Sequence, residues 1–220
     1  MTPAATALAS EAHVWFISLR EDVRARGAAA CRAAARAALD RVVATYAPEA
    51  HVVHRAGRRP EVRGAPLHVS LAHTSALAVA AITRAVEIGV DVEPVRAAPP
   101  RAVLAQLLTD RETAAVSALQ PSARGRAFTR AWVRKEAVLK AAGVGLSLDP
   151  RWFEVGIDRP PKKPVTLPGG QVATVVDLAV VGHEAAVAFV GAAAPIVRVR
   201  SDSTLTRTGV TPLPGALAVR

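Results

Sequence analysis

The sequence has little cysteine, few aromatic residues and almost no lysine. Its single cysteine, Cys31, excludes an intramolecular disulfide and any zinc site built on cysteines. Aromatic residues make up only 4% of the chain, which leaves little stacking capacity, and no zinc-finger or RNA-binding aromatic motif occurs. The sequence contains no run of the ~20 consecutive apolar residues that a membrane-spanning helix needs. We therefore expect no membrane and no nucleic acid among the partners.

The remaining composition is typical of a globular protein. Apolar residues make up 51% of the 220 residues and charged residues 21%, whereas a disordered chain has low hydrophobicity and high charge. Acidic Glu11 and Asp22 flank the first apolar run, and no basic segment precedes it. A secretory signal needs such a basic segment. We therefore expect a cytoplasmic protein.

The net charge is strongly positive. Lysine and arginine exceed aspartate and glutamate by 28 − 18 = +10, and only four of these cations are lysines. Such an arginine bias in an alanine-rich chain fits a GC-rich genome. A positive surface would also attract phosphate-bearing ligands, nucleic acid or an acidic protein, and charge alone leaves these three open.

The pattern of apolar residues predicts a mixed α/β (α+β) fold in two similar halves. Each half reads as helix followed by strands, which indicates an internal duplication and hence an intramolecular pseudodimer. A proline-interrupted connection after residue 93 marks the expected boundary. The predicted helices cover residues 21–46, 101–108, 111–119 and 125–142, and the predicted strands 13–19, 67–71, 77–82, 87–93, 152–157, 172–181 and 185–190. We expect an N-terminal half over 1–95, a C-terminal half over 96–191 and a flexible tail over 192–220.

Two carboxylates end the predicted strand 87–93. Alternation along a strand places Asp91 and Glu93 on one face, about 7 Å apart. Such a pair is costly unless it is solvated or neutralised, and Mg²⁺ neutralises it well. An acidic pair on an exposed edge strand is the alternative. The position of the two carboxylates at the end of an otherwise apolar strand favours a metal site over an exposed acidic pair.

The strongest predicted helix carries a second charged pair. Glu136 and Lys140 are four residues apart and share one helix face, as in an ordinary surface salt bridge. However, Lys135 and Lys140 stand in a chain whose cations are mostly arginine. This choice indicates that a compact ammonium group is needed at these positions.

A third candidate lies in a predicted hairpin turn. His73 follows an apolar strand, and the small polar residues Thr74 and Ser75 come next. There a ring nitrogen could donate to an anion, although a lone histidine is more often structural. A Ser-His-Asp triad is not indicated, because the sequence contains no G-x-S-x-G nucleophile elbow.

Together these motifs resemble the 4′-phosphopantetheinyl transferase superfamily, of the monomeric surfactin-synthetase-activator type. The matching segments are LAHTS at 71–75, GVDVE at 89–93, WVRKEAVLK at 132–140 and GVGLS at 143–147. Their order and spacing agree with the family pattern over about residues 13–190. The resemblance implies the pseudodimeric family fold, a monomer, and transfer of phosphopantetheine from coenzyme A to a serine of an acidic, helical acyl or peptidyl carrier.

The resemblance also implies roles for individual residues. The implied Mg²⁺ ligands are Asp91, Glu93 and Glu136, of which Glu136 is the favoured general base. The implied catalytic and phosphate-binding residues are Lys140 and His73. The implied coenzyme A contacts are Arg32, Arg58, Arg59, His73, Thr74, Lys135 and Lys140.

Two positions depart from the family pattern. Ala72 replaces a serine that touches phosphate, and Ala33 replaces a threonine, so the 3′-phosphate pocket differs from that of the family. Two other functions remain as alternatives. Another Mg²⁺-dependent phosphoryl-transfer enzyme would use the same carboxylates, but the sequence has no G-x-x-x-x-G-K-[ST] loop. A basic nucleic-acid-binding protein would explain the charge but leave the carboxylates unused.

Overall fold

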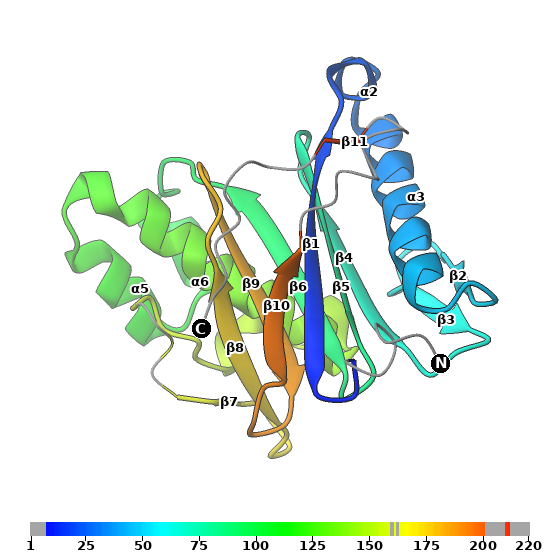
Figure 1. Ribbon diagram of the computed structural model, residues 1–220. Helices are drawn as coiled ribbons and strands as arrows, with labels where there is room; N and C mark the ends of the chain where they lie inside the picture. The colour runs from blue at the N-terminus through cyan, green and yellow to red at the C-terminus, as the bar shows by residue number, and fades with distance from the viewer. Residues whose placement is uncertain (1–7, 159–160, 162, 201–209, 212–220) are drawn as a thin grey trace. The chain divides into compact units, whose positions relative to one another are not determined.

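The structure is a computed structural model that describes residues 8–158, 161, 163–200 and 210–211 (Figure 1). The chain divides into two compact units. Unit 1 comprises Met1–Ile88 and Pro195–Arg220, and unit 2 comprises Gly89–Ala194. The division falls before residues 89–93, whereas we expected it after residue 95. Asp91, Glu93, Glu136 and Lys140 therefore all belong to unit 2.

Unit 1 contains a mixed sheet and one long helix. Its sheet has the order β10-β1-β5-β4, with β11 also paired to β1. The strands are β1 (Glu11–Leu19), β4 (His68–His73), β5 (Leu77–Thr83), β10 (Ile196–Arg200) and β11 (Val210–Thr211). A separate hairpin consists of β2 (His51–Val53) and β3 (Glu61–Arg63). Neighbouring strands in the main sheet are antiparallel, except that β10 runs parallel to β1.

The predicted helix over residues 21–46 is two helices. α2 (Glu21–Ala25) ends before Gly27, whose φ of +86° interrupts the helix, and α3 (Ala28–Tyr46) follows. Only α3 has a buried face. Its small and branched residues recur at helical spacing and pack against the sheet residues in one core: Cys31, Ala35, Ala38, Leu39, Val42, Val43 and Tyr46.

The expected tail over 192–220 begins with an ordered strand. β10 pairs with β1 from Glu11 opposite Ile196 to Trp15 opposite Arg200. Val197 is buried, and Arg198 Nε lies 3.0 Å from Glu11 Oε1. The sequence I-V-R-V-R alternates as a one-sided edge strand does, so residues 196–200 cover an edge of β1 that would otherwise be open. Residues 201–209 and 212–220 of the expected tail lie outside the described residues.

Unit 2 packs a long helix on a four-stranded sheet. The sheet order is β6-β9-β8-β7. Its strands are β6 (Ile88–Pro94), β7 (Val165–Thr166), β8 (Val172–Leu178) and β9 (His183–Val190). The helices are α4 (Arg101–Leu107), α5 (Asp110–Ala118) and α6 (Pro121–Ala142), followed by two short 3₁₀ helices, η1 (Gly145–Ser147) and η2 (Pro150–Trp152). α6 supplies much of the buried core of this unit.

The predicted strand over residues 152–157 is wrong. This segment starts in η2 and continues without strand pairing. Side chains satisfy its backbone instead, because Arg134 donates to the carbonyls of Val155 and Gly156 while Glu112 accepts from their N–H groups. A β-ladder is therefore not needed to satisfy these groups.

The two units share an order of elements. In unit 1 the central strand order is β1-β5-β4, with α3 following the first strand along the chain. In unit 2 it is β6-β9-β8, with α6 following the first strand. The expected internal duplication stays a prediction.

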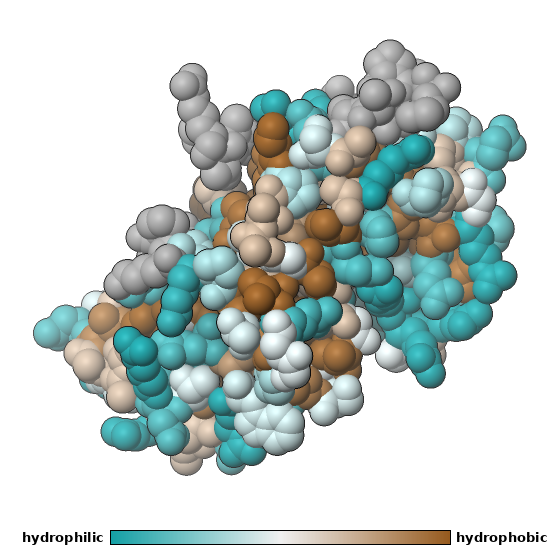
Figure 2. All heavy atoms as spheres, turned by 90° about the horizontal axis from the view of Figure 1, so that it is seen from below, coloured by the Kyte–Doolittle hydropathy of each residue, from teal (hydrophilic) through white to brown (hydrophobic). Residues whose placement is uncertain are grey.

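Apolar residues also reach the surface. Figure 2 shows hydrophobic residues interspersed with hydrophilic ones over the face in view. The large apolar residues that are exposed are Val103, Val144, Trp152, Val181 and Ile196. Within the described residues, none of the helices combines the length and apolar character needed to cross a bilayer.

Candidate functional site

The site in unit 2 depends on a close contact between β6 and α6. A Cβ atom on Gly89 would lie 2.0 Å from the carbonyl oxygen of Ala137 and 2.4 Å from the backbone nitrogen of Ala141. Only glycine therefore fits at this position of β6. The approach of the two backbones brings the next residues of the strand against the last two turns of α6.

Lys140 bridges from α6 to this strand. Its Nζ lies 2.7 Å from Asp91 Oδ1 and donates to the carbonyl of Val90 at 3.1 Å. The simple alternative of a solvated pair between Lys140 and Glu136 is wrong, since Lys140 is bonded to β6. Asp91 is buried and Lys140 is largely buried. The ammonium group is thus fixed beside a carboxylate in a partly desolvated position.

Three carboxylates share this environment. Burial raises the pKa of Glu136 most, and Asp91 and Glu93 raise it further, while Lys140 opposes them. Burial also raises the pKa of Glu93, with Asp91 as the next cause. The negative charges of β6 and α6 therefore destabilise one another, and a cation would relieve the repulsion.

One oxygen of this cluster has no partner. Asp91 Oδ2 is buried and makes no hydrogen bond to any described residue. Within the described part of the chain, no three acidic, histidine or cysteine side chains are arranged to hold a metal ion. The donor chemistry nevertheless fits a hard divalent cation, because carboxylate oxygens are the ligands that Mg²⁺ prefers. An unsatisfied buried oxygen is the kind of group that such an ion satisfies.

Lys135 does not join this cluster. Its side chain is fully buried, with Nζ 2.8 Å from Glu112 Oε2 and donating to the carbonyls of Pro150 and Phe153. All three ammonium hydrogens therefore have partners inside unit 2, and none remains for coenzyme A. Burial lowers the pKa of Lys135, while Glu112 opposes that shift. The expected coenzyme A contact is thus replaced by a structural role.

Glu112 is a buried residue with several polar partners, and the sequence did not indicate it. It forms a capping box with Thr109 at the start of α5, and it also accepts from the backbone of Val155 and Gly156. The T-x-x-E spacing signals the cap in the sequence. Nothing in that spacing reveals the ion pair with Lys135.

The predicted turn residues of unit 1 form an ordered hairpin turn. Thr74 Oγ1 accepts hydrogen bonds from the N–H groups of Ala76 and Leu77, each at 3.1 Å. His73 is half-buried at the end of β4, with Nδ1 3.3 Å from the carbonyl of Thr74. Ala72, which stands where the family has serine, is buried.

The three predicted arginines of unit 1 are exposed. Arg59 pairs with Glu87 through both terminal nitrogens, one of them 3.2 Å from Oε1. Arg32 and Arg58 form no ion pair with described residues. These two therefore present free cations to solvent, whereas Arg59 is already neutralised.

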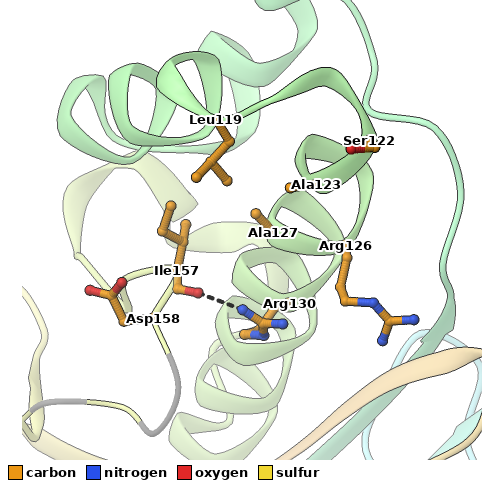
Figure 3. A pocket seen from close by; sticks show the side chains of 8 residues that line it. All are labelled: Leu119, Ser122, Ala123, Arg126, Ala127, Arg130, Ile157 and Asp158. Carbon is orange, nitrogen blue, oxygen red and sulfur yellow. Dashed lines mark hydrogen bonds between the residues drawn. The ribbon is translucent and has the colours of Figure 1, made fainter.

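A pocket of about 350 Å³ lies elsewhere along α6 (Figure 3). Leu119, Ala127 and Ile157 contribute apolar walls, and Arg130 donates to the carbonyl of Ile157. Buried Glu184 pairs with Arg126 and Arg130. None of the predicted site residues lines this pocket. At about 100° per residue, the nine positions between Ala127 and Glu136 place them on opposite faces of the helix.

Comparison with known proteins matches part of the chain to a family. No curated protein sequence matches the chain. Residues 87–190, a stretch that nearly coincides with unit 2 and contains Asp91, Glu93, Glu136 and Lys140, match the family model of the 4′-phosphopantetheinyl transferase superfamily.

Proposed function

We propose that this protein transfers 4′-phosphopantetheine from coenzyme A to a serine of an apo acyl or peptidyl carrier protein. The observation that carries the proposal is the family match over 87–190, together with Lys140 held 2.7 Å from Asp91 in the matched region. The transferase would be of the surfactin-synthetase-activator type. Its two units would form the pseudodimer expected from their shared order of elements.

Asp91, Glu93 and Glu136 are the proposed Mg²⁺ ligands. Support comes from the unpartnered Oδ2 of Asp91 and from the raised pKa of both glutamates. A bound Mg²⁺ would neutralise charge on the pyrophosphate of coenzyme A. These carboxylates would rotate toward the ion on binding, since the described side chains are not arranged as a ligand set.

The reaction is a displacement at phosphorus. The serine oxygen forms a bond to the phosphorus that carries pantetheine, the bond to the bridging oxygen breaks, and adenosine 3′,5′-bisphosphate leaves with the electron pair. The hydroxyl proton passes to a base, and Glu136 is the residue proposed for this role. Lys140 places a point charge beside the pyrophosphate and stabilises charge that develops as the bond breaks.

Unit 1 would hold the rest of coenzyme A. His73 and Thr74 would donate to phosphate oxygens, exposed Arg32 would pair with the 3′-phosphate, and exposed Arg58 would lie beside the adenosine. Arg59 would have to leave Glu87 before it could contribute. Lys135 is omitted from this site because its donors are used.

Intact-mass spectrometry tests the proposal. The purified protein is incubated with coenzyme A, Mg²⁺ and an apo carrier, and the carrier should gain one phosphopantetheinyl group. EDTA should abolish the gain, and a carrier with alanine in place of its serine should stay unmodified. An unmodified serine carrier, across a panel of fatty-acid, polyketide and peptide-synthesis carriers, would overturn the proposal.

A further inference from the structure

A buried histidine in unit 1 joins three elements, and the proposed function leaves it unused. His13 is 1% exposed. Its Nδ1 lies 2.6 Å from the hydroxyl oxygen of Tyr46 on α3, and its Nε2 lies 2.9 Å from Oε2 of Glu11 on its own strand. From β10, Arg200 places Nη2 3.4 Å from the same Nε2. The ring therefore connects β1 with both α3 and β10.

These contacts fit a neutral ring. A carboxylate can only accept, so Nε2 carries the hydrogen that is donated to Glu11. Nδ1 then has the lone pair and accepts from the Tyr46 hydroxyl. A second proton, on Nδ1, would point at that hydroxyl hydrogen and force it to turn away. Burial lowers the pKa of His13 most, and Glu11 opposes this effect.

The strand β10 brings positive charge to this ring. Arg198 Nε lies 3.0 Å from Glu11 Oε1, and Arg200 lies beside Nε2 of the ring. Both arginines lower the pKa of His13 further. On β5, the residue opposite His13 is Ile82, which carries no charge. Among the described residues, the charged or titratable groups that act on the ring are Glu11, Tyr46, Arg198 and Arg200. A protonated His13 would therefore be a third cation beside one carboxylate.

β10 is the element that such repulsion would move first. It stands at the end of the sheet order and pairs with β1 alone among the described strands. One of its five side chains, Val197, is buried. Segments with few buried apolar contacts open at a lower free-energy cost than the core of a sheet. β1 is held along its other edge by β5, so it would stay in place.

We propose that protonation of His13 releases β10 from β1, so that residues 196–200 respond to pH. This inference goes beyond the proposed function and does not depend on it. When β10 leaves, Arg198 and Arg200 leave with it and the ring gains contact with water, so the pKa of His13 rises toward its ordinary value of 6.5. The released state therefore binds the proton more tightly, and docking of β10 weakens as the pH falls below 6.5. A released β10 leaves the edge of β1 open to another strand.

Amide hydrogen exchange of β10 tests the proposal. It is measured at pH values from about 7.5 to about 5.5, where ordinary carboxyl groups stay ionised, and is corrected for the intrinsic effect of pH on exchange. In the parent, protection of residues 196–200 should fall by up to about tenfold for each pH unit below the ordinary histidine value, which is the limit for one proton. Protection of β5 should stay constant.

His13→Gln is the informative substitution. The Gln amide can donate to Glu11 and accept from Tyr46, but it does not titrate. Protection of residues 196–200 should then be independent of pH over this range. His51→Gln, at an exposed histidine of β2, is the matched control and should keep the parental pH dependence.

Arg200→Gln gives a second readout. An NMR titration of the His13 ring should show a raised pKa, because one of the cations that lowers it is gone. The pH dependence of β10 protection should shrink as well. Arg63→Gln, at an exposed position of β3, is the control and should leave the titration of His13 unchanged.

Three results would each overturn the inference. They are protection of β10 that does not change with pH in the parent, parental pH dependence in His13→Gln, and an unchanged titration of His13 in Arg200→Gln. Modification of a carrier decides the proposed function separately.

Discussion

Lys140 is bound to the strand that packs against its helix, and its hydrogen-bond partners among the described residues do not include Glu136. A surface pair with Glu136 would leave the ammonium in water, whereas contacts with Asp91 and the Val90 carbonyl hold it against the carboxylate cluster. In the proposed site, this compact cation would face the negative charge of the pyrophosphate. Arginine cannot reproduce that geometry, because its charge is spread over a planar fork.

Lys140→Arg should therefore fold like the parent and lose most of its activity. A misplaced charge in such a site costs on the order of 10²–10³ in kcat. Transferase turnover measures the loss, and Lys140→Ala should be worse. Exposed Lys163 provides the control, since Lys163→Arg should leave turnover unchanged. Turnover of Lys140→Arg within about twofold of the parent would return Lys140 to a structural role.

The buried glutamates make a prediction about stability and pH. A carboxyl whose pKa is raised by folding binds its proton more tightly in the native state. In the metal-free protein, the stability therefore falls as the pH rises above the ordinary glutamate value of 4.5 and through the raised pKa. Glu136→Gln removes this charge, so the variant should gain stability relative to the parent at neutral pH.

Thermal unfolding with EDTA at several pH values measures this gain. The difference between Glu136→Gln and the parent should shrink as the pH is lowered, because the parent then becomes neutral at that position too. Exposed Glu21→Gln is a suitable control and should show no such trend. A Glu136→Gln variant that is less stable than the parent at neutral pH would contradict the assigned repulsion.

At the scale of elements, the contact of β6 with α6 depends on one glycine. In Gly89→Ala, the new methyl group would overlap the backbone of Ala137, which cannot move without distorting the helix. Overpacking of this kind costs about 1–3 kcal/mol or more in the free energy of unfolding. We also expect transferase activity to fall, because Asp91 and Lys140 would separate.

Urea unfolding of Gly89→Ala measures that cost. Gly27→Ala is the control, because its Cβ meets nothing within 4 Å and only the positive φ is strained. It should lose about 1–3 kcal/mol without losing activity. Equal stability and full activity of Gly89→Ala would show that β6 and α6 do not pack this closely.

The buried pair Lys135–Glu112 gives a prediction for the elements that it joins. Lys135→Met leaves Glu112 charged and buried, which typically costs about 3–5 kcal/mol. Adding Glu112→Gln removes the stranded charge and should recover part of the loss. Equilibrium unfolding of both variants measures the two effects. A Lys135→Met variant with parental stability but a raised KM for coenzyme A would restore the ligand role.

The sequence predicted elements well where the apolar period was strong. Residues 125–142 lie within α6, and residues 87–93 nearly coincide with β6, because both patterns are dictated by burial. It failed at residues 152–157, where side chains of Arg134 and Glu112 satisfy the backbone. Contacts of this kind join residues about twenty or more positions apart, so the local spacing of apolar residues does not reveal them.

At the scale of the whole molecule, the proposed function divides between two units. Unit 2 contains the proposed metal ligands and Lys140, and it nearly coincides with the segment that matches the family. Unit 1 contains His73, Arg32 and Arg58, which are proposed to bind coenzyme A. The net charge of +10 suits both an anionic cosubstrate and an acidic carrier.

The proposed function and site are tested most directly by the mass of an apo carrier after incubation with the protein, coenzyme A and Mg²⁺. We expect a gain of one phosphopantetheinyl group with the parent and little gain with Asp91→Asn under the same conditions. Glu61→Gln, at an exposed carboxylate of β3, should behave like the parent. Equal modification by the parent and by folded Asp91→Asn would contradict the proposed site, and an unmodified carrier with the parent would contradict the function.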